Sequence, residues 1–144
     1  MSGFIEIVEV GARDGLQNEA AVLPADRKLE FIGRLEAAGA RRIEAVSFVN
    51  ERRVPQMAGA EAIMAGLPHQ AGRARIGLVL NMRGWERALA AGVDEANVVV
   101  CCTDGCAGSN LNSGVATRVQ MPVQSGSLSN VIFASPPAAR LSAS

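Results

Sequence analysis

The stretch IGLVLNMRGWERALAAGVDEANVVVC, residues 76–101, decides the fold expected for this chain. It begins with the apolar run Ile76 to Leu80, continues with a helical segment, Arg83 to Ala91, that ends at Gly92, and closes with the apolar run Ala96 to Cys101. Strand, helix and strand in this order, with no hairpin signal between the strands, predict a parallel βαβ unit. Strands that are apolar throughout are typical of sheets covered on both faces.

The same alternation extends toward the N-terminus. Residues Phe4 to Val10 alternate apolar and acidic side chains, which predicts a strand, and the segment GARDG then supplies a turn. Helical apolar spacing after Pro24 predicts a helix that ends at Gly39. Residues Arg42 to Phe48 predict a second strand, and Pro55 to Ala65 a short helix.

The predicted fold class is therefore α/β, built from parallel (β/α) units. A right-handed connection between parallel strands places the helices on the outside of the sheet. The periodicity alone leaves two architectures open, an open doubly wound sheet or part of a (β/α)₈ barrel.

Composition excludes several classes of partner. Fourteen basic residues balance fourteen acidic residues, so no net field attracts nucleic acid or an anionic membrane. No apolar run approaches the ~20 residues that a bilayer-spanning helix needs. Three cysteines, two of them adjacent, do not form a disulfide framework, and we expect a cytoplasmic protein.

A compositional break lies near Asp104. All fourteen acidic residues lie at or before this position, and residues 105–144 carry only two charged residues, Arg118 and Arg140. That segment is rich in Ser, Ala and Pro and has too few apolar side chains to offset its ordering entropy. The sequence predicts one domain over residues 1–104 and an irregular or disordered tail over residues 105–144.

Polar residues gather where the predicted parallel strands end, and this edge carries the chemistry of α/β proteins. They are Arg13, Asp14 and Gln17 after the first strand, Glu44 and Ser47 in the second, Asn81 after the third and Thr103 after the fourth. A carboxylate suits a hard divalent cation, and a guanidinium stabilises a developing oxyanion. The alternative is structural: Arg13 and Asp14 close a loop, and Glu44 is buried in an ion pair for which Arg13 is the candidate partner.

The stretch VEVGARDGLQNE, residues 8–19, resembles the 3-hydroxy-3-methylglutaryl-CoA lyase family. The likeness continues through RIEAVSFVN (residues 42–50), VPQMAG (54–59) and GLVLNMRGWERALAAGVDEANVVV (77–100), and so covers about the first 103 residues. RDGxQ alone is shared with a wider metal-dependent superfamily that includes isopropylmalate and homocitrate synthases. RDGLQNE together with SFV and VPQM points to the lyase branch.

The resemblance implies a TIM barrel that cleaves hydroxymethylglutaryl-CoA to acetyl-CoA and acetoacetate with Mg²⁺ or Mn²⁺. It implies that Arg13 polarises the carbonyl that becomes the enolate, that Glu44 acts beside it, and that Asp14 ligates the metal. It places four further residues against the acyl-CoA substrate: Gln17, Ser47, Asn81 and Thr103.

The chain departs from the family pattern in two respects. It has no HxH pair, which in the family completes the metal site, and Cys101, Cys102 and Cys106 lie in the wrong region to be the family's proton donor. A barrel of this type needs roughly 250 residues, so the likeness predicts its first half only, apparently incomplete. Two alternatives follow: a related acyl-CoA aldolase or synthase, or a non-catalytic truncated α/β fragment. Open strand edges and an apolar inner face would favour self-association.

Overall fold

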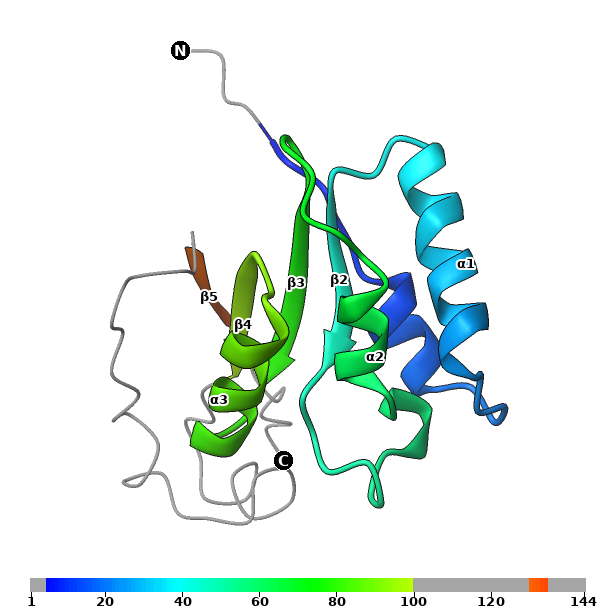
Figure 1. Ribbon diagram of the computed structural model, residues 1–144, viewed down its shortest axis with the longest axis vertical. Coiled ribbons are helices and arrows are strands. Elements are labelled where there is room, and N and C mark those ends of the chain that lie inside the picture. The colour runs from blue at the N-terminus through cyan, green and yellow to red at the C-terminus, as the bar shows by residue number, and fades with distance from the viewer. Residues whose placement is uncertain (1–4, 100–129, 135–144) are drawn as a thin grey trace, which may run out of the picture.

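The computed structural model describes residues 5–99 and 130–134 (Figure 1). Within these residues five strands form one sheet: β1 (Val8–Glu9), β2 (Arg42–Ser47), β3 (Ala74–Val79), β4 (Glu95–Val99) and β5 (Asn130–Ala134). Each strand is parallel to its neighbour, and the spatial order β1-β2-β3-β4-β5 follows the chain. A doubly wound sheet reverses its strand order, whereas a barrel wall does not, so the order favours the barrel alternative.

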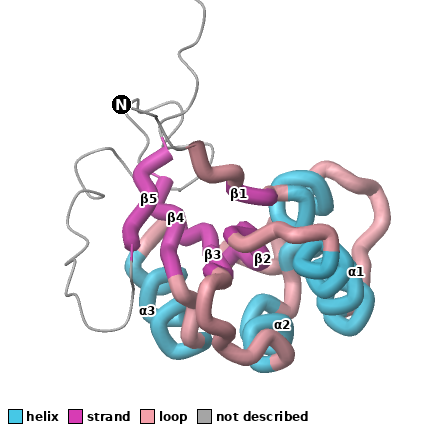
Figure 2. The backbone as a smooth tube through the Cα atoms, turned by 90° about the horizontal axis from the view of Figure 1, so that it is seen from above, coloured by secondary structure: helices cyan, strands magenta, loops and turns pink. Residues whose placement is uncertain are grey.

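Three helices connect and cover the strands: α1 (Ala25–Ala37), α2 (Ala60–Ala65) and α3 (Met82–Ala91). They lie together on the outer side of the curved sheet, as expected from right-handed crossovers (Figure 2). Asn81 caps α3 by accepting a hydrogen bond from the backbone N–H of Gly84, and the helix ends at Gly92, whose φ is 72°. None of the helices in the described part of the chain is long and apolar enough to cross a bilayer.

Two predicted elements differ from the structure near the N-terminus and after β2. The predicted strand shrinks to Val8–Glu9, and GARDG forms a π-helical turn, Gly11–Gly15, whose first amide donates to Glu9 Oε1 at 2.6 Å. The predicted helix over residues 55–65 is split into a 3₁₀ turn, Pro55–Met57, and α2. Gly59 separates them because its left-handed backbone, with a φ of 84°, interrupts the helical path.

The hydrophobic core lies between the outer face of the sheet and the helices. Ile43, Val79 and Val98 contribute from the strands, while Ile32 and Trp85 contribute from α1 and α3. Because side chains alternate along a strand, the residues between these core positions face the inside of the curve.

That inner face carries charged and amide side chains beside the apolar Ile76 and Leu78, so the expectation of an apolar face was wrong. The strand register places Arg42 and Glu44 of β2, and Glu95 and Asn97 of β4, on this face, with Ile76 of β3 between them. Two contacts cross β3: Arg42 forms an ion pair with Glu95, and the neutral Asn97 amide donates to Glu44. These contacts satisfy part of the requirement that polar groups in a buried layer be hydrogen-bonded, while Arg42 Nε, Ser47 Oγ and Asn97 Oδ1 have no partner among the described residues.

Most of the predicted tail lies outside the described residues. Of residues 105–144, the structure describes Asn130–Ala134, which pair in parallel with β4 as β5. Thr103, like Cys101, Cys102 and Cys106, is outside the described ranges. The domain boundary at residue 104 stays a prediction.

Candidate active site

Arg13 and Glu44 form the centre of the site. Arg13 comes from the π-helical turn after β1 and reaches the second strand, where its Nε and Nη2 donate to Glu44 Oε2 at 2.8 and 2.6 Å. The Glu44 side chain is only 2% exposed, so its carboxylate depends on this pairing. The expected ion pair between a buried Glu44 and Arg13 is confirmed.

Asn97 is a member of the site that sequence reasoning missed. Asn97 lies in β4, two strands away from β2, and its Nδ2 donates to Glu44 Oε1 at 2.7 Å. Arg13 and Asn97 therefore engage one oxygen each of the same carboxylate and fix its orientation. The available signal was an asparagine inside the apolar run Ala96 to Cys101, where a polar side chain needs a partner.

Asp14 lies on the solvent side of the pair. Its carboxylate is 56% exposed, and Oδ1 accepts a hydrogen bond from Arg13 Nη1 at 2.8 Å. Within residues 5–99 and 130–134, no three His, Cys, Asp or Glu side chains lie close enough together to hold a metal ion. A divalent cation prefers six or more oxygen ligands, so the described residues do not fit a complete cation site.

The remaining predicted site residues fall in three different places. Ser47 ends β2 on the inner face and is 1% exposed, and Gln17 is half-buried just after the π-helical turn. Asn81 is exposed at the start of α3, where its side chain is engaged in capping. Thr103 is not among the described residues. The structure thus brings Arg13, Asp14 and Glu44 together.

A separate cavity of about 710 Å³ lies between the loop after β2 and the start of α3. Nine residues line it: Phe48, Val49, Asn50, Glu51, Arg52, Asn81, Arg83, Gly84 and Arg87. Asn81 belongs to this cavity, whose lining does not include Arg13 or Glu44. The pocket is therefore distinct from the Arg13 cluster.

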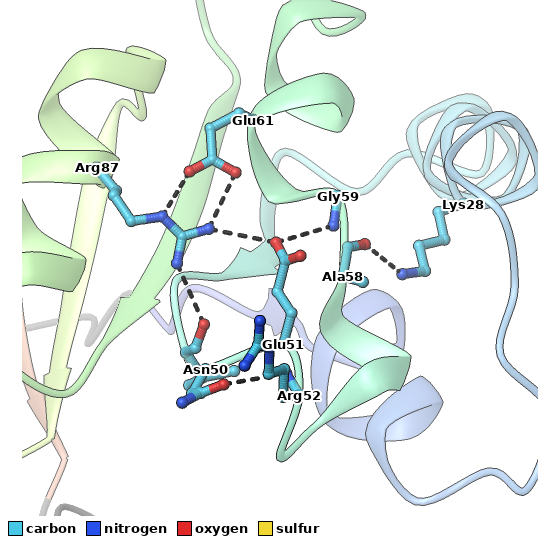
Figure 3. Close-up of polar contacts among 9 residues, drawn as sticks. Lys28, Asn50, Glu51, Arg52, Ala58, Gly59, Glu61 and Arg87 are labelled. Atoms are coloured by element: carbon cyan, nitrogen blue, oxygen red, sulfur yellow. Dashed lines mark hydrogen bonds and ion pairs between the residues drawn. The ribbon is translucent and has the colours of Figure 1, made fainter.

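Arg87 of α3 anchors the loop after β2 (Figure 3). It donates to both oxygens of Glu61, at 2.6 and 3.0 Å, and to Glu51 and the carbonyl of Val49. Its guanidinium also lies 5.6 Å from the centre of the Phe48 ring, within cation–π range. Hydrogen bonding to Arg87 lowers the pKa of Glu61 and raises that of Arg87.

Lys28 supports the same loop from the other side and gives a pH-dependence that can be measured. Its Nζ donates to the carbonyl of Ala58 at 2.9 Å, and burial lowers the pKa of Lys28, with Glu51 partly opposing the shift.

Between this lowered pKa of Lys28 and 10.5 the unfolded chain binds more protons than the folded chain, so we expect the free energy of unfolding to rise with pH in that window. Urea unfolding of the wild type and Lys28→Met should show the rise only in the wild type. Equal pH slopes in the two proteins would contradict it.

The sequence matches the family model described as HMGL-like over residues 4–125. This match runs past residue 104, beyond the first 103 residues that contain the motifs of the resemblance. The chain is 42% identical over 112 residues to the human cytoplasmic 3-hydroxy-3-methylglutaryl-CoA lyase, covering 78% of this chain and 30% of that protein. It is 39% identical over 111 residues to hydroxymethylglutaryl-CoA lyase from Pseudomonas mevalonii, covering 77% and 37%.

Solved structures agree with these sequence matches. The HMG-CoA lyase from Brucella melitensis superposes with a TM-score of 0.71 at 44% identity, covering 78% of this chain and 40% of that one. An HMG-CoA lyase from Acinetobacter baumannii in complex with coenzyme A and 3-methylmalate gives 0.74 at 32% identity, covering 81% and 39%. The chain spans about a third of the length of the curated relatives it matches. Its fold is the N-terminal part of the lyase barrel, and the chain belongs to the HMGL-like family.

Proposed function

We propose that this chain supplies the carbonyl-binding part of a carbon–carbon lyase that cleaves 3-hydroxy-3-methylglutaryl-CoA to acetyl-CoA and acetoacetate. In this cleavage the hydroxyl loses its proton and becomes the ketone of acetoacetate. The electron pair of the broken carbon–carbon bond forms the enolate of acetyl-CoA, which then takes up a proton. A cationic donor held beside the thioester oxygen stabilises that enolate.

The observation that carries the proposal is the fixed guanidinium of Arg13 at the carboxyl ends of the strands. A guanidinium has five N–H donors, and Arg13 uses three of them, two on Glu44 and one on Asp14. Two donors remain for a substrate oxygen. Both oxygens of Glu44 are engaged, by Arg13 and Asn97, so we assign Glu44 the role of positioning Arg13.

Calorimetry with 3-hydroxy-3-methylglutaryl-CoA, followed by an acetoacetate assay of the same mixture with Mn²⁺, tests the proposal. We expect the wild type to bind and cleave the ligand, and Arg13→Met to bind at least about tenfold more weakly and form no acetoacetate. Arg27→Met is the matched control, because Arg27 is exposed on α1 and pairs with Glu30. Binding without acetoacetate in the wild type rejects the lyase, and equal binding by Arg13→Met and the control rejects the site.

We further propose that Asp14 contributes one ligand to a divalent cation, Mg²⁺ or Mn²⁺. A single exposed carboxylate with water is a weak site, so a Mn²⁺ titration should show weak binding that Asp14→Asn abolishes. Asp26→Asn, which removes an exposed carboxylate from α1, should leave the titration unchanged. Tight binding, or weak binding that survives Asp14→Asn, would refute the role of Asp14.

Self-association is proposed through the β1 edge of the sheet. Ile5 and Ile7, which lead into β1, are 86% and 82% exposed, and β1 pairs on one side only among the described strands. An exposed apolar strand edge is a template for a second copy of the chain. Light scattering over a dilution series should show a dimer that dissociates in the double variant Ile5→Asp/Ile7→Asp. The control Val22→Asp, at another exposed apolar position, should remain dimeric; a monomeric wild type at every concentration would refute the proposal.

We propose a cytoplasmic location. Three cysteines that form no disulfide framework suit a reducing compartment. Among the relatives, the human protein is named cytoplasmic, and others are named mitochondrial.

A further inference from the structure

The cavity between the loop after β2 and the start of α3 has a positively charged lining. Three arginines line it, Arg52 from the loop and Arg83 and Arg87 from α3, and Glu51 is the acidic residue among the described residues of the lining. Arg83 and Arg87 are four residues apart, so they are neighbours on one face of the helix. Like charges at this spacing repel each other, and a negative partner in the cavity would relieve the repulsion.

Arg87 already has negative partners, whereas the other two arginines do not. Arg87 donates to Glu61 and to Glu51 Oε1, and that oxygen of Glu51 also accepts from a backbone N–H at 3.3 Å (Figure 3). Arg52 and Arg83 are exposed, and neither guanidinium forms an ion pair within residues 5–99 and 130–134. The cavity therefore has two guanidinium groups with which no described carboxylate is paired.

The two asparagines of the lining also leave donors free. Oδ1 of Asn81 accepts from the backbone N–H of Gly84 at 2.9 Å, and Oδ1 of Asn50 accepts from that of Arg52 at 3.0 Å. Each amide thus has its acceptor engaged and keeps an Nδ2 group with two N–H donors. Apart from the second carboxylate oxygen of Glu51, the side-chain polar groups of the lining that stay free among the described residues are therefore donors.

We propose that this cavity binds a phosphate dianion, held by Arg52 and Arg83 and by the Nδ2 groups of Asn50 and Asn81. At neutral pH a phosphate group carries about two negative charges and several strong acceptor oxygens, and arginine binds it through parallel N–H···O bonds. A volume of about 710 Å³ accommodates the phosphate and a small molecule that carries it. The site is distinct from the Arg13 cluster, so the inference goes beyond the proposed function and does not depend on it.

Calorimetric titration with inorganic phosphate, in about 0.15 M chloride so that exposed surface charges are screened, tests the site. We expect the wild type to bind phosphate and the double variant Arg52→Met/Arg83→Met to bind it at least about tenfold more weakly. Arg53→Met is the matched control, because Arg53 is exposed, follows Arg52 in the chain and does not line the cavity.

Asn81→Asp tests the amide donor without removing the cap of α3. Aspartate keeps an oxygen for the Gly84 N–H, but it replaces the free Nδ2 donor by a negatively charged oxygen, so phosphate binding should again weaken about tenfold. Urea unfolding accompanies each titration. The substituted arginines are exposed and form no ion pair among the described residues, so the double variant should be as stable as the wild type and decides the question even if Asn81→Asp is destabilised.

The proposal is overturned if the wild type binds no phosphate, if the double variant keeps the wild-type affinity, or if Arg53→Met weakens binding as much as the double variant does. A chain that binds phosphate but not 3-hydroxy-3-methylglutaryl-CoA would reject the proposed function and keep this site.

Two sources share the phosphate chemistry, the free ion and the phosphates of an acyl-CoA, and competition distinguishes them. Displacement of inorganic phosphate by CoA but not by 3′-dephospho-CoA would assign the site to the 3′-phosphate, and displacement by both would assign it to the diphosphate. Displacement by neither would assign it to the free ion. Each of these results supports the phosphate site and identifies its occupant.

Discussion

Replacing Glu44 with alanine is expected to lower the free energy of unfolding by about 3–5 kcal/mol, a large share of the stability of a small domain. The carboxylate is buried and joins the turn after β1 to β4 through Arg13 and Asn97. Its removal leaves a guanidinium that is 15% exposed with Asp14 as its remaining partner, and it leaves the Asn97 amide without an acceptor. Removing one partner of a buried ion pair costs more free energy than the intact pair contributes, because the other charge is left buried without its partner.

Chemical denaturation of Glu44→Ala measures this loss. Glu30→Ala is the matched control, because Glu30 pairs with Arg27 and Arg34 on the exposed side of α1 and should change stability by less than about 1 kcal/mol. Equal effects of the two substitutions would mean that the Arg13–Glu44 pair does not hold the inner face together.

The second large effect is expected from Phe48→Ala, at about 3–5 kcal/mol. The Phe48 ring is 2% exposed and packs so closely on β3 that a Cβ added at Gly77 would lie 2.7 Å from it. The ring also supports the Arg87 guanidinium that anchors the loop after β2. Its loss therefore opens a cavity in the core and loosens the wall of the neighbouring pocket.

Thermal or urea unfolding of Phe48→Ala should be compared with Val22→Ala. Val22 is 53% exposed in the segment before α1, so truncating it removes much less buried surface and is expected to cost less than about 1 kcal/mol. A loss below about 1 kcal/mol for Phe48→Ala would show that the ring is not part of the packed core.

The order of strands and helices was predictable because the apolar residues of β2 to β4 lie in short segments between turn residues and each long helix has apolar spacing. The boundaries of α1 and α3 follow from Pro24 and Gly92, which act locally. The break at Gly59 was not predictable from pattern, since glycine inside a helical run is tolerated and its left-handed backbone appears only in the folded chain.

The candidate site was predictable only in part. A glutamate inside an apolar strand requires a partner, which pointed to the Glu44–Arg13 pair. The hydrogen bond between Asn97 and Glu44 was not predictable, because it depends on the register of three strands. The two residues lie 53 positions apart in sequence. The same register brings the charged residues of β2 and β4 onto the inner face. The apolar residues of each strand, considered one strand at a time, did not indicate this. Asn81 looked like a site residue by position alone, and its cap on α3 is the contact that the structure records.

The most direct test of the central claim, that Arg13 held by Glu44 receives the acyl group, is a crystal structure of this chain with 3-hydroxy-3-methylglutaryl-CoA. The account predicts the thioester oxygen within hydrogen-bond distance of the Arg13 guanidinium. An acyl group bound instead in the cavity between the loop after β2 and the start of α3, with Arg13 touching no ligand atom, would contradict it.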